Sequence, residues 1–294
     1  MPELPEVETI RRHLAPHVEG RRLDRLEILD PRWALPLAPG ELSAAVEGRR
    51  VHRLGRRGKY LVWELEDDAF LLVHLRMTGT LLLDPEERPA HTRVRFVVGD
   101  GELVFVDPRR FGTGELAVGR AAQEAFFAAR LGVEPLDAAF TVAHLRALAR
   151  GCRAPVKAML LDQKRIAGVG NIYADEALFR AGIHPLRRAD RLTAGQCLAL
   201  RDAVVASLAA GIEAKGATID DFRDPGGARG GFQDRFLIHL REGEPCPRCG
   251  RPVRKLRAAG RGTYACERCQ PRPRRYAAAA RSSSSPSRSA RTSS

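Results

Sequence analysis

Two cysteine pairs near the end of the chain constrain its fold more than any other feature of the sequence. Cys246 and Cys249 form one C-x-x-C pair, and Cys266 and Cys269 form a second pair after an interval of sixteen residues. Four thiolates at this spacing can surround one zinc ion tetrahedrally and leave no coordination position for water. We therefore expect one structural Zn²⁺ ion that holds a β-hairpin finger. A redox-active dithiol pair is the weaker alternative.

The first part of the chain has the pattern of one helix followed by short strands. Apolar residues recur at helical spacing from Val7 to Val18 and predict an amphipathic helix that ends before Gly20. The clearest strand-like runs after it are Lys59–Leu65, Phe70–Leu75, Thr92–Val98 and Glu102–Val106. Short strands without intervening helices predict an antiparallel sandwich or barrel, with the first helix packed on one side.

The second part of the chain is helical and ends in the cysteine module. Its clearest helical segments are 154–163, 172–180 and 194–214. A glycine-rich stretch, Asp224–Gly231, is predicted to be a mobile loop, with a plain linker as the alternative. We expect a two-domain α+β protein. The predicted divisions are 1–120 for the helix and β-sandwich, 121–225 for the helical domain, 226–270 for the loop and finger, and 271–294 for a disordered basic tail rich in Ser and Arg.

The charge of the chain favours a polyanionic partner. Its 49 Lys and Arg residues against 36 Asp and Glu residues leave a formal charge of +13, and cations near phosphate release condensed counterions. A solvated basic face is the alternative. Only five of the cations are lysines, which gives modest extra weight to Lys59 and Lys157 as proton carriers.

The sequence also gives expectations for the cellular location and the oligomeric state. We find no run of about 18 apolar residues and no apolar signal-peptide region, so we expect no membrane span. We therefore expect a cytoplasmic protein, whose thiols stay reduced. Nothing in the sequence argues for an oligomer, so a monomer is expected.

The first residues offer a possible nucleophile. Removal of Met1 would leave Pro2 with an α-amine roughly 2–3 pKa units less basic than a lysine. An unprotonated secondary amine can form an iminium ion with a sugar C1′, and Glu3 beside it could move protons. The plain alternative is that prolines and glutamates simply begin a helix. The turn Gly168–Asn171 can likewise bind an anion through helix N–H groups or only cap the helix.

Six motifs occur in order between Pro2 and the finger. They are Pro2–Thr9 (PELPEVET), Gly58–Leu61 (GKYL), His74–Gly79 (HLRMTG), Asp107–Gly112 (DPRRFG), Gly168–Tyr173 (GVGNIY) and the four cysteines. Together they resemble the bacterial formamidopyrimidine-DNA glycosylase family, also called 8-oxoguanine DNA glycosylases, from Pro2 to about Gln270. The resemblance implies a base-excision repair enzyme that acts on double-stranded DNA with oxidised purines or abasic sites. It also implies a helix–two-turns–helix DNA-binding unit in the helical domain.

The resemblance implies catalytic roles for four residues. Pro2 would attack C1′ and form a Schiff base, and Glu3 would be the acid that assists ring opening and base departure. Lys59 would supply a proton during β-elimination, and Arg261 at the finger tip would assist δ-elimination.

The resemblance also implies residues that hold the DNA. A base inside a duplex must be rotated out, and Met77, Arg109 and Phe111 match the wedge that fills the gap. Without the family pattern, Met77 and Phe111 could be core residues, and Arg109 could pair with Asp107. Besides Arg109, the residues implied at or near the DNA are the backbone contacts His91, Arg153, Lys157 and Asn171.

Two other functions fit parts of the sequence. An endonuclease VIII-like glycosylase would share the fold but prefer oxidised pyrimidines, and the Leu4–Val7 opening with the wedge residues favours the purine-type enzyme. A non-catalytic DNA-binding zinc protein would not need Pro2 and Glu3 together. A reducible covalent adduct with damaged DNA separates the enzyme from the binding protein.

Overall fold

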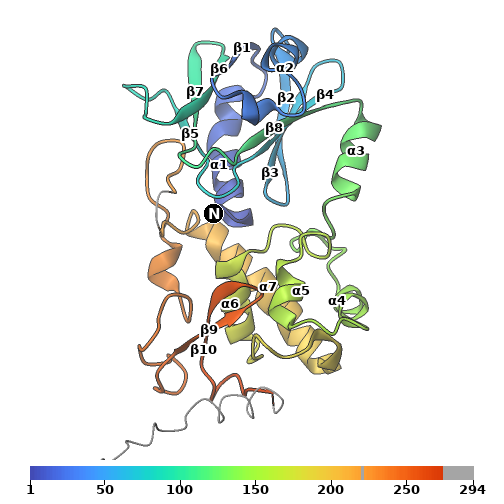
Figure 1. Ribbon diagram of the computed structural model, residues 1–294, viewed down its shortest axis with the longest axis vertical. Coiled ribbons are helices and arrows are strands. Elements are labelled where there is room, and N and C mark those ends of the chain that lie inside the picture. The colour runs from blue at the N-terminus through green and yellow to red at the C-terminus, as the bar shows by residue number, and fades with distance from the viewer. Residues whose placement is uncertain (220–221, 274–294) are drawn as a thin grey trace, which may run out of the picture.

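The structure, a computed structural model, describes residues 1–219 and 222–273. It has two lobes: the strands β1–β8 form one, and the helices α4–α7 with the hairpin β9–β10 form the other (Figure 1). The N-terminus of the chain lies at the junction of the lobes. The expected two-domain α+β fold is confirmed. Most of the predicted tail, residues 274–294, lies outside the described residues.

Two antiparallel four-stranded sheets form the β-sandwich. The first has the order β1 (Leu23–Ile28), β6 (Thr92–Val98), β7 (Gly101–Val106) and β5 (Thr80–Leu83). The second has the order β2 (Val51–Arg57), β3 (Tyr60–Leu65), β4 (Ala69–His74) and β8 (Thr113–Val118). Side chains alternate between the faces of β3, because Leu61 and Trp63 enter the core between the sheets while Val62 faces the other way. The rings of Trp63 and Phe96 stack across this core, 5.3 Å apart.

The expectation of strands without intervening helices is wrong. A 3₁₀ helix, η1 (Pro31–Ala34), and the helix α2 (Pro39–Val46) lie between β1 and β2. The helix α2 begins with Pro39 in its first turn, and the Glu41 side chain accepts the backbone N–H of Ala38 at 3.0 Å. Its Leu42 and Val46 are fully buried in the sandwich core, which stabilises a helix of only two turns.

The second lobe is built from helices around its own apolar core. The helices are α4 (Val142–Ala149), α5 (Val156–Leu161), α6 (Asn171–Arg180) and α7 (Ala194–Glu213), and the 3₁₀ turns are η2 (Ala189–Arg191) and η3 (Phe232–Arg235). The reciprocal bonds between Thr193 and Gln196 cap α7, as the sequence predicts. By length and composition alone, α7 could cross a membrane. It instead contacts α1 (Leu4–Val18), α4 and α6, so it is the central helix of this lobe.

The N-terminal helix joins the two lobes. Its Leu4 belongs to the helical core, whereas Val7, Ile10 and Leu14 belong to the sandwich core. The helix α3 (Arg120–Ala128) lies on the outer face of the second sheet, where Phe127 is buried. The first residues of the chain are therefore fixed between two independent cores.

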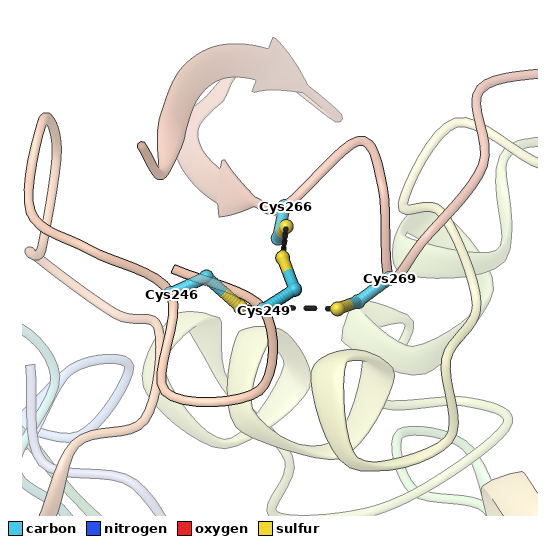
Figure 2. A group of neighbouring side chains, drawn as sticks. All are labelled: Cys246, Cys249, Cys266 and Cys269. Carbon is cyan, nitrogen blue, oxygen red and sulfur yellow. Dashed lines mark hydrogen bonds between the residues drawn. The ribbon is translucent and has the colours of Figure 1, made fainter. Parts of the chain in front are cut away.

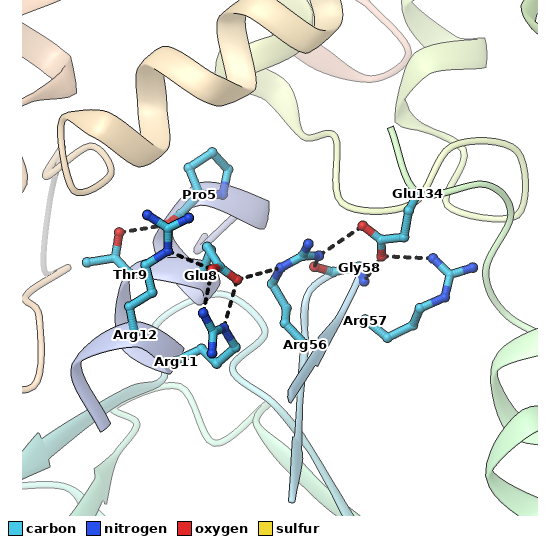
Figure 3. A network of polar contacts seen from close by, with 9 residues as sticks. All are labelled: Pro5, Glu8, Thr9, Arg11, Arg12, Arg56, Arg57, Gly58 and Glu134. Atoms are coloured by element: carbon cyan, nitrogen blue, oxygen red, sulfur yellow. Dashed lines mark hydrogen bonds and ion pairs between the residues drawn. The ribbon is translucent and has the colours of Figure 1, made fainter. Parts of the chain in front are cut away.

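A charged network also ties the lobes together (Figure 3). Glu8 of α1 pairs with Arg56 of β2 at 3.2 Å, and Arg56 pairs with Glu134 at 3.1 Å. Arg57 adds a second pair to Glu134 at 2.8 Å. Because Glu134 lies in the segment between α3 and α4, this network fixes the end of β2 against the connection between the lobes.

The glycine-rich segment expected as a mobile loop is docked on the sandwich. The carbonyl of Arg223 accepts the Thr80 hydroxyl at 3.0 Å, and the carbonyl of Pro225 accepts the backbone N–H of Leu83 at 2.8 Å. The Asp224 carboxylate accepts the N–H groups of Gly226 and Ala228, which closes a local turn. The segment 223–228 thus links the helical lobe to β5.

Candidate active site

The Glu3 carboxylate lies at the N-terminus of α6. It accepts the backbone N–H groups of Ile172 at 3.0 Å and Tyr173 at 3.5 Å, and Glu3 is only 2 % exposed. The free N–H groups and the dipole of a helix N-terminus favour a negative charge. From the sequence, the Gly168–Asn171 turn was expected either to bind an anion through helix N–H groups or only to cap its helix. In the structure, these N–H groups bind the carboxylate side chain of Glu3.

The two glycines of this turn make room for the N-terminal segment. A Cβ atom on Gly170 would lie 2.2 Å from the Glu3 carboxyl carbon, and one on Gly168 would lie 2.6 Å from the Leu4 side chain. Gly168 also has a φ of +86°, and its carbonyl accepts the backbone N–H of Leu4 at 3.1 Å. Glycine is therefore required at both positions by close approach.

Glu6 is a buried acid that the sequence alone does not single out. Its side chain accepts the backbone N–H of Glu3 at 2.8 Å, the hydroxyl of Tyr173 at 2.8 Å and the backbone N–H of Ala217 at 2.8 Å. Burial, with the nearby Glu3 charge, raises the pKa of Glu6. The only sequence signal was its place three residues after Glu3, where a capping-box glutamate stands.

Lys59 follows a tight turn between β2 and β3. Gly58 has a φ of +57°, and its N–H donates to Glu134, the acid of the charged network. The side chain of Lys59 is only 5 % exposed, and burial lowers its pKa, opposed by the charges of Glu3 and Glu6. Lys59 is thus a buried ammonium group whose proton is easier to remove than that of a surface lysine.

A pocket of about 600 Å³ brings together side chains from both lobes and the finger. Its lining includes Lys59, Met77, Phe111, Asn171 and Arg261, which were all predicted as site residues. A smaller pocket of about 100 Å³ adjoins it at Met1 and Met77 and is lined by Pro2 and Glu6. The structure therefore gathers residues that lie more than 200 positions apart in the sequence.

His74, the first residue of the HLRMTG motif, also lines the larger pocket. Its Nδ1 accepts the backbone N–H of Arg76 at 2.9 Å, and its ring meets the Tyr60 ring edge-on at 4.5 Å. Burial, with the charges of Arg76 and Lys59, lowers the pKa of His74 to about 3. His74 is therefore neutral at physiological pH.

The wedge residues extend from two loops that Asp107 holds together. Asp107 is fully buried, and its carboxylate accepts the Thr78 hydroxyl and the backbone N–H groups of Phe111 and Gly112. Met77 is 39 % exposed and Phe111 is 50 % exposed, so neither is a core residue.

The remaining wedge residue, Arg109, is exposed. Its guanidinium lies 4.8 Å from the centre of the Phe111 ring. Only the backbone N–H of Arg109 bonds to Asp107, at 3.2 Å, which removes the alternative of a side-chain ion pair with that residue.

The candidate DNA contacts do not all lie on the surface. His91 and Arg153 are exposed, and the Asn171 side chain donates to the carbonyl of Gly262 at 3.1 Å. Of these, only Asn171 lines the larger pocket. Lys157 is fully buried and donates to Asp175 at 2.7 Å, so its ammonium group is not on the surface in this structure. Its charge is neutralised within the protein.

The four cysteines converge as the sequence predicts (Figure 2). Their sulfur atoms all lie within 4.8 Å of one another, and the hairpin β9 (Arg254–Ala258) and β10 (Arg261–Ala265) lies between the two pairs. Four thiolates without a further ligand suit a structural zinc ion. The hairpin carries Arg261 at its tip, so the ion would fix the base of the element that reaches into the pocket.

Three family models match the chain in sequence order. They are the formamidopyrimidine-DNA glycosylase N-terminal domain at residues 1–114, the formamidopyrimidine-DNA glycosylase H2TH domain at residues 131–223, and the zinc finger found in FPG and IleRS at residues 243–272.

Curated relatives cover almost the whole chain. The formamidopyrimidine-DNA glycosylase of Heliobacterium modesticaldum is 45 % identical over 277 residues, which cover 92 % of this chain and 100 % of the relative. The protein of the same name from Thermus thermophilus is 46 % identical over 274 residues, which cover 92 % and 98 %.

Solved structures agree with these relatives. The MutM (FPG) protein of Thermus thermophilus has a TM-score of 0.84 at 44 % identity and covers 92 % of this chain and 98 % of its own. A Lactococcus lactis FPG mutant in complex with DNA that contains Fapy-dG has a TM-score of 0.87 at 34 % identity and covers 92 % and 100 %. Lactococcus lactis Fpg in complex with abasic-site DNA has a TM-score of 0.86 at 34 % identity, with the same coverage.

Proposed function

The chain belongs to the formamidopyrimidine-DNA glycosylase family, and from this premise we propose that it excises oxidised purines from duplex DNA with Pro2 as the nucleophile. The solved relatives bind DNA that contains Fapy-dG or an abasic site, which supports the same substrates here. The enzyme is a DNA-formamidopyrimidine glycosylase, and it cleaves the resulting abasic site by β,δ-elimination. A chain that repairs chromosomal DNA would work in the cytoplasm, associated with the nucleoid.

One observation carries the mechanistic proposal: the N-terminal segment is fixed between the two cores beside a pocket that also holds Lys59 and Arg261. After loss of Met1, the Pro2 nitrogen attacks C1′ of the damaged nucleotide, and the base departs. The Glu3 carboxylate, held by the N-terminus of α6, takes up the proton that the Pro2 nitrogen loses when the N–C1′ bond forms and returns it during sugar-ring opening, which assists base departure. Lys59 supplies a proton in β-elimination, and Arg261 assists δ-elimination.

The exposed residues around the pocket support a role in opening the duplex. Met77 and Phe111 would fill the gap left by the everted nucleotide, because large apolar side chains replace the lost stacking. Arg109 would donate to the cytosine left without its partner. Asn171, His91 and Arg153 would contact the DNA backbone from the surface.

Zinc is structural in this proposal. Cys246, Cys249, Cys266 and Cys269 would hold the ion, which fixes the finger and takes no part in bond making. We also propose the divisions predicted from the sequence, with a catalytic β-sandwich domain at 1–120, a helix–two-turns–helix domain at 121–225 and the loop with the finger at 226–270.

Borohydride trapping on duplex DNA that holds 8-oxoguanine opposite cytosine tests the proposal. We expect one reduced adduct, located by mass spectrometry on Pro2 with Met1 absent. Pro2→Gly should lose most of the trapping, whereas Pro31→Gly, a change at an exposed proline outside the site, should not.

The other outcomes separate the remaining functions. An adduct formed only with an oxidised pyrimidine would indicate an endonuclease VIII-like preference. Tight DNA binding without any adduct would indicate a non-catalytic DNA-binding protein, and an adduct at another residue would refute the role of Pro2.

A further inference from the structure

A continuous line of buried polar side chains runs beneath the finger hairpin. His239 Nδ1 lies 2.8 Å from one carboxylate oxygen of Asp175, and Lys157 Nζ lies 2.7 Å from the other. Lys157 Nζ also donates to the Thr263 hydroxyl of β10 at 2.7 Å. All four side chains are at most 3 % exposed. Buried charges in such a line are stable only while each keeps its partners.

The two ends of this line lie on different elements. His239 follows η3, and its segment is fixed to α6 because Glu176 accepts the backbone N–H groups of Leu237, Ile238 and His239. Asp175 is also on α6, and Lys157 is on α5. Thr263 is two residues from Arg261 on the finger, so the line connects the helical core with the hairpin tip.

The hairpin tip is held from its inner side. The Thr263 hydroxyl donates to the carbonyl of Arg261 at 3.1 Å, and the carbonyl of Gly262 accepts Asn171 at 3.1 Å and Lys157 at 3.4 Å. At Gly260, on the other side of the tip, an added Cβ would meet nothing within 4 Å. A two-stranded hairpin is marginally stable by itself, so these bonds help to fix the backbone from which the Arg261 side chain enters the pocket.

We propose that His239, Asp175, Lys157 and Thr263 form a positioning relay that holds Arg261 in the active-site pocket. The inference rests on the proposed role of Arg261 in δ-elimination. All four side chains are buried, and each acts through the backbone of Arg261. The relay also explains why Lys157 is a buried lysine: a compact ammonium group can satisfy Asp175, Thr263 and Gly262 at once.

The relay predicts a selective defect. Loss of the hydroxyl of Thr263 should leave base excision and β-elimination intact, because the hydrogen bonds of Thr263 go to Lys157 and Arg261 and not to Pro2, Glu3 or Lys59. The δ-elimination step should slow, because a displacement of about 1 Å at a reacting group can cost on the order of 100-fold in rate. For the loss of one of several anchors we expect about a ten-fold decrease.

The test compares Thr263→Val, which replaces the hydroxyl by a methyl group of similar size, with Thr263→Ser, which keeps it. Each protein is incubated with duplex DNA that carries a preformed abasic site, and the β-product and the β,δ-product are quantified on a denaturing gel. Thr263→Val should lower the ratio of β,δ-product to β-product about ten-fold, with 8-oxoguanine excision within two-fold of the original. Thr263→Ser should restore the ratio, and zinc content should be equal in all three proteins.

A double-mutant cycle adds a second measurement. His239→Phe keeps an aromatic ring but removes the hydrogen bond to Asp175. It should therefore lower the ratio of β,δ-product to β-product by a smaller factor than Thr263→Val does. If the residues act through one line, the decrease in the Thr263→Val, His239→Phe protein will be smaller than the product of the two single effects.

Three results would overturn the relay: an unchanged ratio in Thr263→Val, an equal loss of excision and both eliminations, or independent effects in the cycle. If the original protein forms no adduct and no β,δ-product, the proposed function fails and the relay fails with it. A normal adduct and a normal product ratio in every variant would refute the relay alone.

Discussion

Replacement of Gly170 by alanine tests whether the position of the Glu3 carboxylate limits base excision. The added Cβ would lie 2.2 Å from the Glu3 carboxyl carbon, whereas ordinary contact begins near 3.4 Å. The carboxylate must therefore move by about 1 Å and weaken its bond to the Ile172 N–H. A shift of about 1 Å in a catalytic group costs on the order of 100-fold in rate, so we expect 8-oxoguanine excision by Gly170→Ala to fall by about that factor.

Single-turnover excision kinetics and thermal unfolding separate this effect from simple destabilisation. Gly170 is the N-cap of α6, and its change to alanine should cost about 1 kcal/mol, or roughly 2–4 °C in melting temperature. Gly195→Ala is the matched control, because it lies in the first turn of α7 and its added Cβ would meet nothing within 4 Å. The control should be fully active and up to about 1 kcal/mol more stable. A Gly170→Ala protein that excises at the original rate would show that α6 does not position the acid.

Three further changes have defined outcomes. Glu134→Gln should lower the free energy of unfolding by about 2 kcal/mol, because it weakens the ion pairs with Arg56 and Arg57. Since Glu134 also accepts the N–H of Gly58, next to Lys59, the change should slow β-elimination more than base excision. Equal effects on both steps would contradict this connection to Lys59. Because the pKa of His74 in the folded state is lowered from 6.5 to about 3, the unfolded chain binds the proton first as the pH falls, and the free energy of unfolding decreases. Between pH 7 and pH 4 this loss should be about 3 kcal/mol in the original protein and absent in His74→Gln, measured by urea titration. The same pH dependence in both proteins would refute the prediction. Zinc removal by a chelator should unfold the finger and abolish duplex binding measured by fluorescence anisotropy, whereas full affinity without zinc would contradict a structural ion.

The sequence was sufficient to predict the features that depend on short segments. The cysteine spacing predicted the convergence of four thiols, and the strand-like run Lys59–Leu65 predicted β3. The helix α2 was missed because its eight residues carry only Pro39 and Glu41 as signals, and their effect depends on burial of Leu42 and Val46 against distant strands.

The contacts of the buried acids could not be predicted from local patterns. The contact between Glu3 and Ile172 joins residues 169 positions apart, and the contact between Glu6 and Tyr173 joins residues 167 positions apart. In the sequence these glutamates have the pattern of helix-capping residues. Their proximity to the pocket follows from α1 entering both cores, which no periodicity of a single segment encodes.

The two lysines show how one sequence signal can identify a residue but not its role. Their rarity in an arginine-rich chain marked Lys59 and Lys157 as candidates, and both side chains are buried. Lys59 lines the pocket with only the distant charges of Glu3 and Glu6 to stabilise its ammonium form, so it can exchange a proton. Burial also lowers the pKa of Lys157, but the Asp175 carboxylate at 2.7 Å opposes that shift and holds the ammonium group in place. The difference between a proton carrier and an anchor therefore lies in whether a carboxylate partner is in direct contact, and the three-dimensional structure alone determines that.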